Sequence, residues 1–130
     1  MERRLITGHS PYEAVAGFSR AVVVGDRVHV AGTAPIPADG SPPPESAYDQ
    51  ASLCLRIIGE ALGRAGSGLE HVVRMTTYLK QGVDVTVFRE RSRLPDDALP
   101  AATAVFVHSL VDPDYLMEVE VTAVVPTAGP

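Results

Sequence analysis

The sequence lacks residues and segments on which several common classes of protein depend. Asparagine is absent, which excludes N-linked glycosylation. Cys54 is the only cysteine, so the chain cannot form an intrachain disulfide, and no histidine, cysteine or carboxylate spacing resembles a metal site. No apolar run approaches the roughly 18 residues of a membrane span, and the apolar segment of a secretory signal does not follow the N-terminal arginines. We therefore expect a reduced, cytoplasmic protein with no metal, no cofactor and no membrane contact.

Basic side chains are scarce as well, and almost all of them are arginine. The 11 basic residues include a single lysine, Lys80, and the formal net charge is −5. Proteins that bind nucleic acid neutralise its phosphates with lysine and arginine, so this balance argues against a nucleic-acid partner. The basic stretch at residues 89–93 is more simply explained as the solvent-facing side of a helix. Side-chain amides are restricted to Gln50 and Gln81.

What is present is the composition of an ordinary globular domain. Hydrophobic residues make up 45% of the 130 residues and charged residues 21%. A chain of this length buries roughly two thirds of the surface that it exposes when unfolded, so we expect a single domain over residues 1–130. Cys54 follows the helical spacing of apolar residues and is expected to be a small core residue rather than a nucleophile.

Local patterns predict an alternation of strands and helices. Two β-branched runs flank Gly25 and Asp26, a pair suited to the tight turn of a hairpin. Ser46 is a suitable N-cap and Gly66 a suitable C-terminal stop for a long helix. The predicted elements are a candidate strand at 3–7, a hairpin at 21–32, a helix at 47–66, a strand at 70–80, a helix at 84–94 and a closing hairpin at 99–125. This order predicts an α+β fold with one sheet and both helices on one of its faces.

The closing hairpin carries two acids on strands otherwise suited to burial. Alternation predicts one face made of Thr103, Val105, Val107, Val119 and Val121. The opposite face then holds Glu118 and Glu120 together with His29, Ala31, Ala102, Ala104 and Phe106. If the helices cover the valines, this second face is too apolar to be fully solvated and too charged to be a core. We expect it to be a subunit interface with small pockets.

Three stretches of the chain stand out together: GFSRAVVVGDRVHVAGTAP, LEHVVRMTTYL and LPAATAVFVHSLVDPDYLMEVEVTAVV. In this order they resemble the opening motif, the central strand and the ending of a known family, the YjgF/Rid superfamily of reactive-intermediate deaminases. The similarity covers about residues 5–125. It implies a chorismate-mutase-like α+β domain, a single sheet with two helices packed on one face, that assembles as a homotrimer. It also implies small-molecule ligands in clefts at the subunit interfaces.

The resemblance directs attention to one substitution. The family's P-A-R-(S/T) motif carries an arginine that binds the substrate carboxylate, and the matching residues here are P-A-A-T, with Ala102 at the arginine position. An arginine fork makes a strong, bidentate contact with a carboxylate. By analogy with charge pairs at interfaces, its loss costs on the order of 2–5 kcal/mol of carboxylate binding. Activity on ordinary 2-imino acids is therefore not expected.

The resemblance also implies a set of site residues. The ligand-binding positions are Phe18, Gly32, Thr33, Arg89, Ala102 and Ala104. Phe18 stands in place of a tyrosine and Ala104 in place of a cysteine, whereas the backbone of Gly32 can approach a ligand closely. Glu120 matches the acid that positions or activates water, and a dry, apolar face would raise its pKa toward neutrality. A structural contact with a neighbouring subunit is an equally weighted alternative for Glu120.

The remaining polar residues have weaker claims to a role in the site. Glu118 is expected to make a structural contact, and Arg89 to be exposed to solvent unless it reaches the cleft as a substitute cation. His29 and His108 are candidate proton carriers, but interface or surface positions are the simpler expectation for both.

Three functions stay open. The first is an enzyme that transfers protons in an inter-subunit cleft, as an imine or enamine hydrolase (a deaminase) or a tautomerase, with Glu120 as the catalytic residue. The alternative is a non-catalytic small-molecule-binding or regulatory trimer. A ribonuclease has the least support, because the net charge is −5 and the sequence offers no acid–base pair of histidines.

Overall fold

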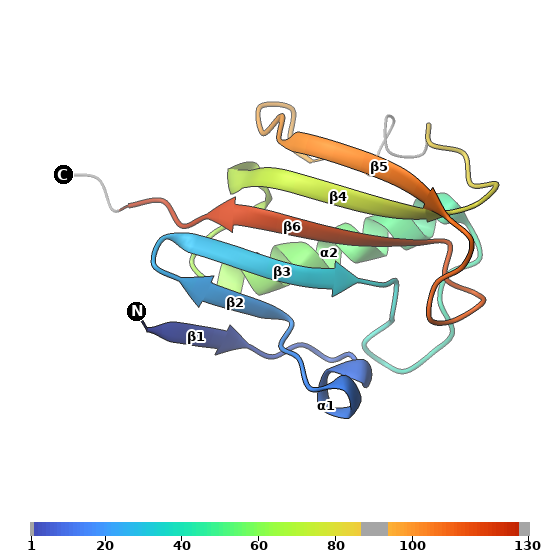
Figure 1. The fold of residues 1–130 in the computed structure, drawn as a ribbon, viewed down its shortest axis with the longest axis horizontal. Coiled ribbons are helices and arrows are strands. Elements are labelled where there is room, and N and C mark those ends of the chain that lie inside the picture. Colours follow the sequence, from blue (N-terminus) through green and yellow to red (C-terminus); the bar gives the residue numbers. More distant parts are fainter. Residues whose placement is uncertain (1, 87–93, 128–130) are drawn as a thin grey trace.

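A mixed sheet of six strands, with one long helix across it, forms most of the described protein (Figure 1). The computed structural model describes residues 2–86 and 94–127. Its elements are β1 (Arg3–Ile6), α1 (Tyr12–Ala16), β2 (Ala21–Val24), β3 (Arg27–Thr33), α2 (Ala47–Arg64), the 3-10 helix η1 (Leu69–His71), β4 (Val72–Lys80), β5 (Ala101–Val107) and β6 (Met117–Val124). The predicted α+β class, one sheet with two α-helices, is confirmed.

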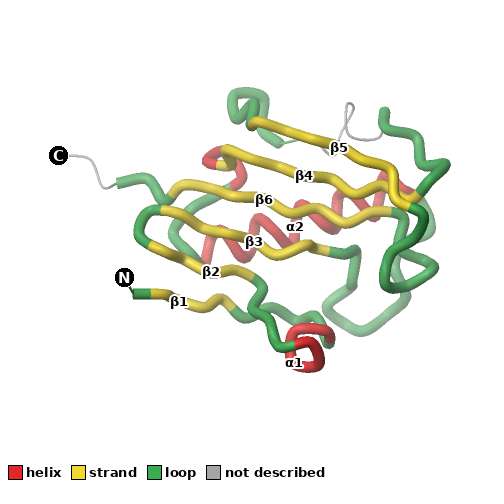
Figure 2. The backbone as a smooth tube through the Cα atoms, in the orientation of Figure 1, coloured by secondary structure: helices red, strands yellow, loops and turns green. Residues whose placement is uncertain are grey.

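The strands lie in the order β1-β2-β3-β6-β4-β5 (Figure 2). β4 and β5 are parallel, and the other neighbouring pairs are antiparallel. The predicted first hairpin is confirmed, because Val24 pairs with Arg27 across a two-residue turn. Gly25 in that turn has a φ of 60°, a conformation that glycine adopts without strain. The candidate strand at residues 3–7 is confirmed as β1.

The predicted closing hairpin is wrong, because β5 and β6 are not neighbours. β6 lies between β3 and β4, and β5 forms the far edge of the sheet beside β4. Alternate residues of β6 are buried along its whole length, whereas β5 is exposed apart from the half-buried Val107. Val119 and Val121 are therefore covered by the helix, while Thr103 and Val105 are exposed. The strand that can bury one complete face takes the central position, and the strand that cannot takes the edge.

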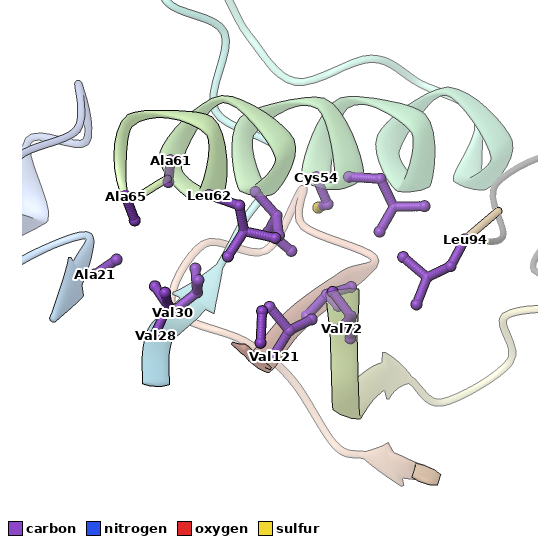
Figure 3. Packing of buried hydrophobic residues seen from close by; sticks show 14 of the residues in the cluster. Ala21, Val28, Val30, Cys54, Ala61, Leu62, Ala65, Val72, Leu94 and Val121 are labelled. Atoms are coloured by element: carbon purple, nitrogen blue, oxygen red, sulfur yellow. The ribbon is translucent and has the colours of Figure 1, made fainter. Parts of the chain in front are cut away.

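The long helix α2 begins and ends close to the predicted residues. The Ser46 hydroxyl accepts a 3.0 Å hydrogen bond from the Asp49 amide and caps the first turn. Gly66 follows the last turn with a φ of 85°. The apolar side of α2 packs on β3 and β6 (Figure 3). Cys54 is fully buried in this core, as predicted, and burial raises the pKa of its thiol.

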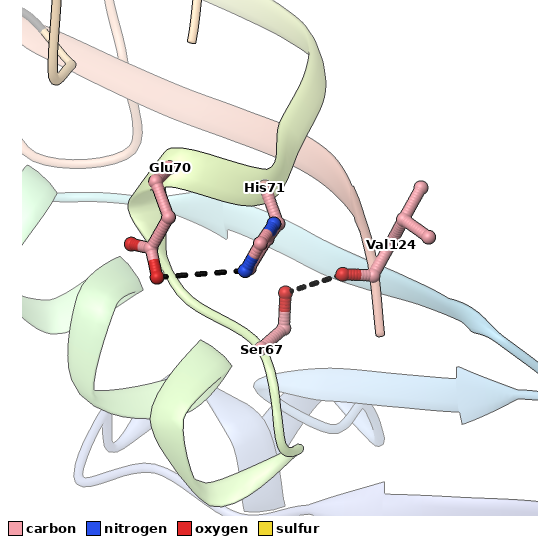
Figure 4. A network of polar contacts seen from close by, with 4 residues as sticks. All are labelled: Ser67, Glu70, His71 and Val124. Atoms are coloured by element: carbon pink, nitrogen blue, oxygen red, sulfur yellow. Dashed lines mark hydrogen bonds and ion pairs between the residues drawn. The ribbon is translucent and has the colours of Figure 1, made fainter. Parts of the chain in front are cut away.

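The connection after α2 is tied to β6. The Ser67 hydroxyl donates a 2.7 Å hydrogen bond to the Val124 carbonyl, and Nε2 of His71 lies 3.5 Å from Oε1 of Glu70 (Figure 4). The bond from Ser67 holds the turn after the helix against the last residue of β6. The helix is thereby anchored to a strand that it covers.

The second α-helix of the fold is one that the sequence patterns do not predict. α1 follows Pro11 and ends at Gly17, which has a φ of 75°, and it lies beside the ends of β1 and β2 (Figure 1). The helix predicted at 84–94 falls largely on residues 87–93, which lie outside the described residues. No helix within residues 2–86 and 94–127 is long and apolar enough to cross a membrane.

Candidate functional site

A cavity of about 320 Å³ lies between α1, the end of β3 and the chain that leads into β6. Its apolar walls include Phe18, Ile36, Leu110 and Val111. The cavity is also lined by polar residues: a serine, two tyrosines, an arginine and a glutamate (Ser10, Tyr12, Tyr115, Arg20 and Glu118). A hollow that is mostly apolar and contains a few convergent polar groups is typical of a small-molecule site.

Glu118 is the acid of this cavity. It is half-buried on β6, and its carboxyl group lies across Gly32 of β3, where a Cβ would be 3.0 Å from Cδ of Glu118. Burial raises the pKa of this carboxyl group, the positive charge of Arg20 opposes that shift and the charge of Glu120 adds to it. A carboxyl group whose pKa is raised in an apolar hollow holds its proton to a higher pH than an ordinary carboxyl group, so it is better suited to act as a proton donor.

Arg20 is the cation of the cavity. Only 4% of its surface is exposed, and Nη2 donates a 2.6 Å hydrogen bond to the Gly32 carbonyl. The guanidinium carbon lies 5.7 Å from the centre of the Phe18 ring, within the range of a cation–π contact. Burial lowers the pKa of Arg20, and the nearby charges of Glu13 and Glu118 oppose that change. An arginine remains charged under these conditions, so the cavity holds a fixed positive charge.

The two tyrosines of the cavity interact with each other. Burial raises the pKa of Tyr115, and a hydrogen bond with Tyr12 raises it further. Gln50 holds the chain that carries Tyr115: its Nε2 donates to the carbonyls of Pro44 (2.8 Å) and Asp114 (2.9 Å), and its Oε1 accepts from the Leu116 amide (2.8 Å). Gln50 is 1% exposed. The amide of this residue therefore serves to position the cavity wall.

The predicted site residues do not all come together within this chain. Phe18 and Gly32 line the cavity. Thr33 is fully buried, and its hydroxyl donates a 2.9 Å hydrogen bond to the Ala31 carbonyl. Ala102 and Ala104 lie exposed on β5, which β4 and β6 separate from β3. Arg89 lies outside the described residues.

Glu120 occupies a different depression, of about 230 Å³, on the sheet surface. The Tyr78 hydroxyl donates a 2.7 Å hydrogen bond to Oε1 of Glu120. His29 and Arg74 line the same depression, and Nδ1 of His29 lies 3.5 Å from the Thr122 hydroxyl. His108 is exposed on the chain after β5. In residues 2–86 and 94–127, no group of three or more histidine, cysteine or acidic residues is placed to hold a metal ion.

Alternation predicts both acids on one face of the sheet, and the structure places Glu118 in the cavity and Glu120 in the separate depression. Whether Glu118 or Glu120 reaches Gly32 depends on the pairing of β6 with β3, in which Thr33 is opposite Val119. A register irregularity between Val30 and Thr33 shifts that pairing. No local pattern in the sequence predicts this irregularity. Arg20 was missed for a related reason, since a single arginine before a strand usually faces solvent.

A single mixed sheet covered by one long helix defines an α+β domain. Comparisons with known proteins agree. A family model described as Endoribonuclease L-PSP matches residues 7–125. An uncharacterized protein of Streptomyces coelicolor is 37% identical over 122 residues, which cover 93% of this chain and 90% of that protein. A RutC family protein of Pyrococcus abyssi is 31% identical over 125 residues, which cover 95% and 98%.

Solved structures give the same result. A Mycobacterium tuberculosis protein described as a member of the YjgF/YER057c/UK114 family superposes with a TM-score of 0.75 at 34% identity, over 95% of this chain and 99% of that chain. RidA from an Antarctic Psychrobacter superposes with a TM-score of 0.80 at 27% identity, over 92% and 97%. The chain belongs to the Endoribonuclease L-PSP family, the YjgF/Rid group that its motifs resemble.

Proposed function

We propose that the protein is an enzyme that hydrolyses small imines or enamines in the cavity, with Glu118 as the residue that transfers protons. The observation that carries this proposal is the position of Glu118, half-buried against Gly32 in a largely apolar hollow, where burial raises the pKa of its carboxyl group. General acid–base catalysis is most effective when the pKa of the catalytic group lies near the working pH.

The chemistry requires one group that both donates and accepts a proton. Water adds across the C=N bond of an imine, and cleavage of the C–N bond then yields a carbonyl compound and ammonia. Protonated Glu118 donates its proton to the nitrogen, and the resulting carboxylate takes a proton from the attacking water. In the second step Glu118 again protonates the nitrogen and accepts the proton of the new hydroxyl group, so that ammonia leaves and the carbonyl forms. For an enamine, protonation of carbon and loss of a proton from nitrogen first yield the imine, and this tautomerisation is the step that a tautomerase performs alone. Phe18 is proposed to contact the apolar part of the substrate.

The proposed assembly is a homotrimer with ligand clefts at the subunit interfaces. β5 is an exposed edge strand, and its Phe106 is 57% exposed, a combination that favours association with another chain. In such a trimer, Ala102 and Ala104 would contact a ligand in the cavity lined by Phe18 only if they came from a neighbouring subunit. Mass measurement under native conditions should give three times the chain mass, and a stable monomer would contradict the assembly.

The test of function uses freshly generated imines and enamines, with and without an α-carboxylate. Wild-type protein should release ammonia, and Glu118→Gln should lose about 10²–10⁴-fold in rate, the usual contribution of general acid–base catalysis. Glu60→Gln, a change of an exposed acid on α2, is the matched control and should behave as wild type. If Glu120→Gln lost a comparable factor in rate while Glu118→Gln kept full activity, the catalytic residue would be Glu120 and not Glu118.

The same assay distinguishes the alternatives. Saturable binding without turnover of any imine or enamine would favour a non-catalytic binding or regulatory protein. RNA incubated with the protein should stay intact, because a net charge of −5 does not favour a polyanionic substrate. Specific cleavage of RNA that depends on the cavity residues would overturn the proposal.

A further inference from the structure

We propose that Arg20 is the anion-binding group of the cavity, so that the ligand is a small organic carboxylate held against the segment that precedes β2 and the end of β3. This inference deepens the proposed function, since it names the class of ligand for the same cavity. Arg20 immediately precedes β2 and lines the cavity together with Phe18 and Gly32.

The hydrogen-bonding capacity of Arg20 is largely unused. A guanidinium carries five N–H donors, and in the described residues Arg20 makes one hydrogen bond to protein, from Nη2 to the Gly32 carbonyl. Its Nε is buried and has no hydrogen-bond partner there. No carboxylate oxygen of the described residues lies within 4.0 Å of its nitrogens. A buried cation without a close counter-ion is costly, and an anionic ligand would relieve that cost.

The two acids near Arg20 do not take the place of such a ligand. Glu13 is committed to the backbone, since its Oε1 accepts a 2.8 Å hydrogen bond from the Gly8 amide and its Oε2 a 3.2 Å bond from the Ser10 amide. Glu118 has a raised pKa because of burial, which favours its neutral form. In its neutral form Glu118 can donate a hydrogen bond to a bound carboxylate. It can also donate a proton to the reacting group of the ligand that lies beside that carboxylate.

The remaining walls define the rest of the ligand. Phe18, Ile36, Leu110 and Val111 present apolar surface, and the cavity measures about 320 Å³. A carboxylate with a compact apolar body satisfies both parts of the site. The arginine missing at position 102 therefore does not imply a neutral ligand, because the positive charge is supplied from the opposite half of the sheet.

The experiment compares two probes of the same shape, benzoate and benzamide, by titration calorimetry on the full chain. Wild-type protein should bind benzoate about tenfold to a hundredfold more tightly than benzamide, the range expected for a charge-assisted hydrogen-bonded contact. Equal affinities, or tighter binding of benzamide, would overturn the inference. This comparison needs no variant.

Variants locate the preference at Arg20. Arg20→Gln should abolish the preference for benzoate and leave benzamide binding in place, because glutamine removes the charge and keeps a polar side chain that can donate a hydrogen bond. Arg20→Lys keeps the charge without the planar fork and should show an intermediate preference. Arg56→Met, a change of an exposed arginine on α2, is the control and should bind as wild type. A preference that survives in Arg20→Gln would overturn the assignment.

Failure of this inference is distinguishable from failure of the proposed function. Turnover of neutral imines that depends on Glu118, without any preference for benzoate, would reject the carboxylate ligand and retain the enzyme. Arg20-dependent binding of benzoate without turnover of any imine would retain the ligand class and reject the enzyme.

Discussion

Glu118 and Gly32 lie so close together that a methyl group at position 32 would not fit without movement. A Cβ on Gly32 would be 3.0 Å from Cδ and 3.1 Å from Oε1 of Glu118. The carboxyl group of the cavity therefore occupies space that any other residue at position 32 would take. The glycine is explained by this contact with Glu118, because its backbone φ is not in the left-handed region.

Gly32→Ala should displace the Glu118 carboxyl group by a few tenths of an ångström. We expect a clear loss of turnover with a change in unfolding free energy of no more than about 1 kcal/mol, because the displaced atoms belong to the end of a flexible side chain. Parallel measurements of turnover and urea unfolding check this. Gly63→Ala is the control: nothing lies within 4 Å of its new Cβ, and it should stabilise α2 by about 0.5–1 kcal/mol without loss of activity. Full activity in Gly32→Ala would contradict the proposed role of Glu118.

The raised pKa of Glu118 predicts a characteristic pH dependence of stability. Between the ordinary carboxyl pKa of about 4.3 and the raised value, the folded protein retains a proton that the unfolded chain has released. The contribution of Glu118 is therefore fully present below the ordinary pKa and is lost as the pH rises through the raised pKa. Glu118→Gln should remove this part of the pH dependence, so that its stability relative to wild type improves as the pH rises.

Urea unfolding at several pH values between about 4 and 8 measures this difference. Glu60→Gln serves as the control and should follow the wild-type curve, since Glu60 is exposed. Parallel curves for wild type and Glu118→Gln would show that the pKa of Glu118 is the same in the folded and unfolded states.

The contact between Tyr78 and Glu120 predicts a shift in a phenol titration. The hydrogen bond that Tyr78 donates to Glu120 raises the pKa of the tyrosine. Glu120→Gln removes the negative charge, so the pKa of Tyr78 should fall toward its ordinary value of about 10. Absorbance titration of the tyrosinate band measures the change, and Tyr78→Phe identifies which of the four tyrosines is responsible. An unaltered titration in Glu120→Gln would contradict the contact.

Gln50 should be among the most sensitive polar positions in the chain. Gln50→Leu leaves the Pro44 and Asp114 carbonyls and the Leu116 amide without their partner. Unpaired buried groups of this kind should lower the unfolding free energy by roughly 2–5 kcal/mol. Ligand binding should also weaken, because the chain that carries Tyr115 loses its anchor. Urea unfolding tests the first effect, and Gln81→Leu, at an exposed glutamine, should change stability by less than about 0.5 kcal/mol.

Several parts of the fold could be predicted from the sequence. The first hairpin follows from the conformational freedom of Gly25 between two β-branched runs. The bounds of α2 follow from the cap at Ser46 and the left-handed Gly66. Burial of Cys54 follows from its place on the apolar stripe of that helix. These are local effects, in which each residue's preference depends on close neighbours in the chain.

The candidate site was predicted less well. The motif was enough to select Phe18 and Gly32, and simple alternation was enough to place two acids on one face of β6. The sequence does not distinguish Glu118 from Glu120, because both have the same local pattern. Only the pairing of β6 with β3, and its irregularity between Val30 and Thr33, decides which acid reaches Gly32.

The sequence by itself determined the class of fold, the family and the residues available to a site. The tertiary structure decided which of them meet: it separated β5 from β6, buried Arg20 beside Phe18 and set Glu118 over Gly32. The physical reason is that caps, turns and alternation act between near neighbours along the chain. The order of strands and the surroundings of a charge depend instead on segments far apart in the sequence that are buried against one another.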